Sequence, residues 1–252
     1  MVFFGGTDRL PHRFCTTGAD DFMNPKTKRR LLFLGGFVLY FGLLWSLWDT
    51  AVIYPLKLFV VLLHEVSHAA AAVATGGTVE RILLNAQQGG ATYTRGGSPF
   101  ITLSAGYLGS LLWGTLFVML AFSRRLKPRW IMVGVGVSVL LLTLFLVRGF
   151  FGMGFGVLFA GALLAGAKYL GQGLNRAFLL GLGLTSALYA ILDIKSDVLD
   201  RPHLPSDAAM LAEMTGIPTA VWGFLWIGVA LLVSAWLLRW VARRMEETGA
   251  PA

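Results

Sequence analysis

Long apolar runs separated by short polar stretches dominate this chain. A helix that spans a bilayer needs about 20 mostly apolar residues, so each of these runs is suited to cross or enter a membrane. Tryptophans lie near the ends of several runs, as aromatic residues at a membrane interface often do. The seven runs cover approximately residues 31–48, 56–75, 98–122, 130–147, 150–167, 176–194 and 217–241.

Two of the connections between the runs carry structure of their own. In residues 78–95, β-branched and aromatic residues flank a Gln-Gln-Gly-Gly turn, which predicts a β-hairpin. Residues 193–216 are rich in Asp and Pro, and they include a stretch that predicts a short helix from Ser206 to Thr215. Ser206 is a suitable N-cap for this helix, and Gly216 a suitable stop.

Composition agrees with a membrane protein. Of the 252 residues, 56% are hydrophobic and 13% charged, whereas soluble domains have about 25% charged residues. The net charge of +8 comes from basic residues that mostly flank the apolar runs, which suits a lipid bilayer with anionic headgroups and not nucleic acid as a partner. We expect an all-α polytopic protein with about six to seven transmembrane or re-entrant helices and a small β-hairpin.

This pattern predicts one membrane-embedded domain over residues 31–245, between a polar N-terminal tail (1–30) and a short C-terminal tail (246–252). The expected location is multi-pass in a cell membrane, such as a bacterial inner or plasma membrane. Both tails border basic residues, so the positive-inside rule places both in the cytoplasm. Seven full crossings would place them on opposite sides; either one run is re-entrant or one terminus breaks the rule.

The second run contains the motif His64-Glu65-Val66-Ser67-His68. Histidines four residues apart share one face of a helix and can hold one metal ion, and the adjacent glutamate can accept a proton from a water on that metal. Three ionisable residues inside an apolar helix are costly without partners, and a zinc ion would partner all of them. The alternative is a buried polar cluster that only fixes helix packing.

A catalytic zinc site needs a third protein ligand. The other histidines, His12 and His203, lie in the N-terminal tail and in a Pro-flanked loop, respectively. Carboxylates are the alternative, and we rank Asp193 first because it ends an apolar run. Asp197 follows one helical turn later and ranks second. Asp207 ranks third, because Asp is favoured in a first helical turn by the helix dipole anyway.

These features resemble the site-2 protease family of intramembrane zinc metalloproteases, in particular its compact M-fifty-B-like branch. The resemblance rests on the His-Glu-x-x-His helix, the hairpin after it, Ser104–Ser110 at the start of the next run, and the late acidic stretch Leu192–Asp197 with Ser206–Ala208. It implies that His64 and His68 bind zinc, that Glu65 activates water and that a late Asp completes the site. Family members carry Leu-Asp-Gly for that third ligand, whereas this chain has Leu192-Asp193-Ile194.

The predicted function is an intramembrane zinc metalloendopeptidase that cleaves membrane proteins or peptides with the catalytic residue Glu65. The hairpin edge could pair with an unwound substrate, and Asn85, Gln87 and Gln88 could bind it by hydrogen bonds; an ordinary connecting hairpin is the alternative. Two other functions stay open. One is a non-catalytic relative of the protease that binds membrane segments, and the other is a transporter that uses the polar cluster as an ion site.

Overall fold

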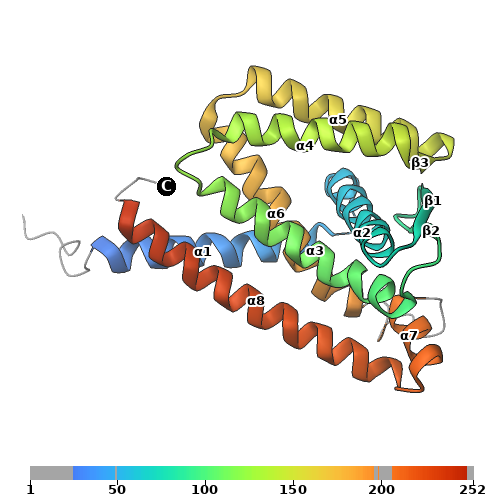
Figure 1. The fold of residues 1–252 in the computed structure, drawn as a ribbon. Helices are drawn as coiled ribbons and strands as arrows, with labels where there is room; N and C mark the ends of the chain where they lie inside the picture. Colours follow the sequence, from blue (N-terminus) through green and yellow to red (C-terminus); the bar gives the residue numbers. More distant parts are fainter. Residues whose placement is uncertain (1–24, 49, 196–197, 199–205, 249–252) are drawn as a thin grey trace, which may run out of the picture.

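The computed structural model describes residues 25–48, 50–195, 198 and 206–248, and it is mostly helical (Figure 1). The predicted all-α class is confirmed. The helices are α1 (Pro25–Ser46), α2 (Tyr54–Ala74), α3 (Pro99–Ala121), α4 (Pro128–Phe145), α5 (Phe150–Tyr169), α6 (Gln172–Lys195), α7 (Asp207–Thr215) and α8 (Thr219–Thr248). The strands are β1 (Thr78–Leu84), β2 (Gly90–Arg95) and β3 (Val147–Arg148).

Each apolar run forms one of the seven long helices, with bounds close to those predicted. Proline lies in the first turn of α2, α3 and α4, where its missing N–H has no intrahelical partner to lose. Helix α1 begins at Pro25 and helix α8 continues to Thr248. Asp197, His12 and His203 lie outside the described residues.

Six of the described helices are long and apolar enough to cross a membrane, namely α2, α3, α4, α5, α6 and α8. Helix α1 offers only the shorter apolar stretch Leu31–Ser46. An even number of crossings returns the chain to its starting side, and α1 begins at the same end of the molecule as α8 ends (Figure 1). The six-helix count therefore agrees with two basic termini on one side, and among the long described helices α1 is the one whose apolar stretch is shorter than a full crossing needs.

Helix α2 is the most enclosed of the six. Of its apolar window, 78% is buried, whereas only 28% is buried in α5 and in α8, which leaves those two helices apolar surface for lipid. Figure 1 shows α2 nearly end-on, surrounded by α3, α4 and α6. Its side chains Leu58, Phe59, Val60 and Leu62 are fully buried. The helix that carries the His-Glu-x-x-His motif is thus the centre of the core.

The predicted hairpin is confirmed as β1 and β2, which pair antiparallel between Thr78 and Arg95. A third strand, β3, pairs parallel with β1 through Ile82 and Val147, and it was not predicted because a two-residue strand has no alternation to detect. The strand order is β2-β1-β3, so β2 is an edge strand. This edge lies beside the face of α2 that carries Glu65, whose backbone carbonyl accepts a hydrogen bond from Thr92 at 2.9 Å.

The predicted short helix is confirmed as α7. The Ser206 side chain caps its start by accepting a hydrogen bond from the backbone N–H of Ala209 at 3.2 Å, and Gly216 ends it with a φ of 72°. Leu211 of α7 is fully buried in an apolar cluster with Tyr107 of α3 and Trp226 of α8. This packing holds α7 at the same end of the molecule as the hairpin (Figure 1).

Candidate metal centre

The two motif histidines lie one turn apart on α2. Their ring centroids are 4.7 Å apart, and the side chains of His64 and His68 are only 12% and 8% exposed. The helix is apolar before and after them, so these imidazoles lie well inside the protein. Because the spacing of four residues directs both rings to the same side, they can present ring nitrogens to one point.

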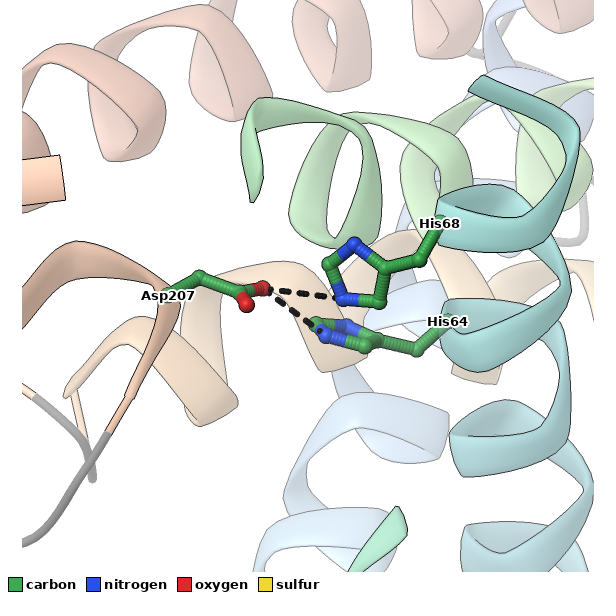
Figure 2. Close-up of side chains that lie close together, drawn as sticks. All are labelled: His64, His68 and Asp207. Carbon is green, nitrogen blue, oxygen red and sulfur yellow. Dashed lines mark hydrogen bonds and ion pairs between the residues drawn. The ribbon is translucent and has the colours of Figure 1, made fainter. Parts of the chain in front are cut away.

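Asp207 of α7 reaches that point from the opposite side (Figure 2). Its Oδ2 lies 3.0 Å from Nε2 of His64 and 3.2 Å from Nε2 of His68. Burial alone would raise the pKa of the Asp207 carboxyl, but the hydrogen bonds and Coulomb attraction of the two histidines outweigh it and lower this pKa to about 2. The site therefore holds an ionised carboxylate between two imidazoles.

The other carboxylate ranked for this role lies further away. Oδ2 of Asp193, near the end of α6, is 3.9 Å from the other ring nitrogen of His64, Nδ1. The carboxylate that the structure brings to both histidines is thus Asp207, which the sequence ranked third, and not Asp193, which it ranked first. The ranking relied on the end of an apolar run, and it could not foresee that α7 folds back toward α2.

These residues fit a zinc ion by their chemistry and by the space around them. Two imidazole nitrogens and one carboxylate oxygen are a common donor set of catalytic zinc sites, and the candidate ligand atoms of His64, His68 and Asp207 all lie within 4.8 Å of one another. Gly106 of α3 lies against them. A Cβ at this position would lie 2.6 Å from Oδ2 of Asp207 and would also meet Nε2 of His64. The missing side chain leaves room for the candidate ligand atoms of His64 and Asp207.

Glu65, the expected general base, is buried and fixed by the hairpin. The hydroxyl of Thr92 lies 2.7 Å from its carboxylate oxygen Oε2, so strand β2 orients this side chain. A Cβ at Gly90 would meet the same carboxylate, with its carbon Cδ only 2.7 Å away. The sequence analysis missed Thr92 and Gly90, because neither differs there from an ordinary strand or turn residue.

Both motif histidines also have aromatic or backbone neighbours that hold their rings. Nδ1 of His68 donates a hydrogen bond to the backbone carbonyl of Thr102 at 2.7 Å. The ring of His64 lies edge-on to the ring of Tyr107, with centroids 5.2 Å apart. With Nδ1 of His68 occupied in this way, its Nε2 is the nitrogen available to a metal.

A cavity of about 800 Å³ opens over this cluster. It is lined by the three candidate ligands, by Glu65 and by the edge strand β2. Gln87 and Gln88, predicted to bind substrate, line it as well. Asn85, predicted with them, is outside this lining; its side-chain oxygen accepts a hydrogen bond from the N–H of Gly89 at 2.9 Å and so stabilises the hairpin turn.

The six-span fold and the two-histidine, one-carboxylate cluster define a multi-pass membrane protein with a centre of the metallopeptidase type. A family model described as Peptidase M50B-like matches residues 37–237, which is more than half of the chain. The chain therefore belongs to the M50B-like peptidase family, as the resemblance to site-2 proteases implied. Neither the curated proteins nor the solved structures gave a significant match.

Proposed function

We propose that this protein is a zinc metalloendopeptidase that cleaves membrane proteins or membrane-associated peptides at a site within its transmembrane helices. The observation that carries the proposal is the convergence of His64, His68 and Asp207 beside Glu65. All of them line one cavity in a helical bundle of a peptidase family. The proposed location is a cell membrane, with the lipid bilayer around the six long helices.

In this mechanism the chain's residues hold the metal and move one proton. His64, His68 and Asp207 would be the zinc ligands. Bound zinc supplies Lewis-acid chemistry that polarises a carbonyl and makes water a nucleophile near neutral pH. Glu65 accepts the proton of the attacking water and returns it to the leaving amine. Thr92 keeps the Glu65 carboxylate in the orientation that this transfer requires.

The edge strand β2 suits the substrate. A membrane segment is helical, and its peptide groups must be freed and then paired again before a peptide bond is exposed to attack. An extended peptide can satisfy those groups by pairing with an edge strand, and β2 borders the cavity that contains Glu65. Gln87 and Gln88 lie at the hairpin turn of the same cavity, where they would hydrogen-bond the peptide.

The absence of Gly after Leu192-Asp193 favours the alternative of a non-catalytic relative. Asp207 makes this alternative less favoured. It brings a carboxylate to hydrogen-bond distance from both histidines, although it does not belong to a Leu-Asp-Gly motif. A transporter of this kind would need a second interrupted helix with polar residues, at the equivalent position of a repeated half of the chain. The sequence contains no internal repeat that could supply one.

The test compares the purified full-length protein with its Glu65→Gln variant on a panel of labelled single-span membrane peptides in liposomes. We expect about one zinc per chain in both proteins and cleavage by the wild type only. Glu213→Gln is the matched control, because Glu213 is an exposed carboxylate of α7 outside the cavity lining. Equal cleavage by wild type and Glu65→Gln, or a wild type that binds no zinc, would overturn the proposal.

A further inference from the structure

The second ring nitrogen of His64, Nδ1, is buried and has no hydrogen-bond partner among the residues that the structure describes. Its surroundings differ from those of the equivalent atom of His68, which is bonded to the carbonyl of Thr102 at 2.7 Å. A buried ring nitrogen that forms no hydrogen bond is destabilising, because it has lost water and gained no partner. When a metal ion takes the lone pair of Nε2, the proton of a neutral His64 ring must lie on Nδ1, and Nδ1 then needs an acceptor within its reach.

The carboxylate of Asp193 is placed to be that acceptor. Its Oδ2 is 3.9 Å from Nδ1 of His64, and the two side chains are only 18% and 12% exposed. The neighbouring Ile194 is fully buried, which fixes this end of α6 against the α3–α7–α8 cluster. A shift of about 1 Å would bring the pair to the usual length of a charge-assisted hydrogen bond.

The position of the proton on His64 depends on whether a metal is bound. In the described structure, Nε2 of His64 faces Asp207 at 3.0 Å, so Nε2–H is the group that donates to that carboxylate. A metal ligand must offer a lone pair, so a zinc ion on Nε2 requires the tautomer with the proton on Nδ1. That proton points toward Asp193, whose negative charge favours this tautomer.

We propose that Asp193 is a positioning residue that accepts a hydrogen bond from Nδ1 of His64 and so holds this ring for metal binding. The proposal rests on the proposed zinc centre and assigns a role to the carboxylate that is not its ligand. The ring of His68 is then held by the backbone carbonyl of Thr102, and the ring of His64 is held by the carboxylate of Asp193. Such outer partners orient the ring and raise its basicity, and their loss weakens metal binding about 10–100-fold.

The experiment measures zinc affinity, not peptidase activity, by chelator competition on the purified full-length protein in detergent. Asp193→Ala should raise the zinc Kd by about 10–100-fold. Asp193→Asn should fall between it and the wild type, because the amide oxygen still accepts the hydrogen bond but carries no charge. The visible absorption of the cobalt-substituted protein should keep its band shape in both variants, since the three ligands are unchanged.

Two reference variants distinguish the loss of a zinc ligand from the loss of a residue that only positions one. Asp207→Ala should lose stoichiometric zinc and change the cobalt spectrum, whereas Glu213→Ala should behave as the wild type. An unchanged Kd in Asp193→Ala would overturn the proposal, and so would a loss of zinc and a cobalt spectrum like those of Asp207→Ala, which would make Asp193 a ligand. A wild type that binds no zinc at all would instead refute the proposed function.

Discussion

Replacing Gly106 by alanine tests the geometry of the metal centre with a single methyl group. The added Cβ would lie 2.6 Å from Oδ2 of Asp207, whereas ordinary contacts of a Cβ begin at 3.4 Å. The Asp207 carboxylate would have to retreat by about 0.8 Å, and Nε2 of His64 is crowded by the same methyl group. Metal–ligand distances tolerate only about 0.2 Å. We expect zinc affinity to fall by at least about 10–100-fold, the loss that follows when only an outer partner of a ligand is removed.

The assay is a chelator-competition titration of the detergent-purified protein, together with a thermal unfolding curve. Gly134→Ala is the matched control, since Gly134 is also a helical glycine and has no heavy atom within 4 Å of an added Cβ. We expect it to bind zinc as the wild type does. A folded Gly106→Ala protein with wild-type zinc affinity would refute the inference that His64 and Asp207 share a metal beside α3.

Two further predictions concern the base and the membrane orientation. Gly90→Ala should displace the Glu65 carboxylate and slow cleavage at least about tenfold. Zinc affinity should stay unchanged, because the three heavy atoms nearest the added Cβ all belong to Glu65 and none to a candidate ligand; a parallel loss of zinc would contradict this. The basic α3–α4 connection and the end of α8 lie opposite α7 (Figure 1), so α7 should be outside the cytoplasm. In a Cys15→Ser background, Glu213→Cys should react with an impermeant maleimide in intact cells and Arg125→Cys should not; the reverse pattern would refute this orientation.

Much of the fold follows from the lengths of the apolar runs. A run of about 20 apolar residues has few alternatives to a helix in lipid, because each backbone group must be satisfied within the segment. The short helix α7 was also predictable, since Ser206 and Gly216 mark its two ends by local chemistry. Strand β3 was not, because its pairing with Ile82 depends on the position of α4 and α5.

The candidate site divides in the same way into local and non-local parts. His64, Glu65 and His68 come from one helical turn, so their spacing alone predicts that they share a face. Asp207 meets His64 across 143 positions of the chain, and nothing near it in the sequence encodes that contact. Its selection over Asp193 depends on where α7 docks, which is a property of packing and not of any motif.

The docking of α7 is therefore the step that completes the centre. A helix of nine residues is too short to be stable by itself in water, where about 12–15 residues are the lower limit. What holds α7 is the apolar contact of the buried Leu211 with Tyr107 and Trp226. The same Tyr107 ring lies against His64, so one aromatic side chain contacts both the helix of the two candidate histidine ligands and the cluster that anchors the third candidate ligand. The apolar packing of α7 thus positions Asp207 within 3.0 Å and 3.2 Å of the two histidines, where their attraction adds to that packing.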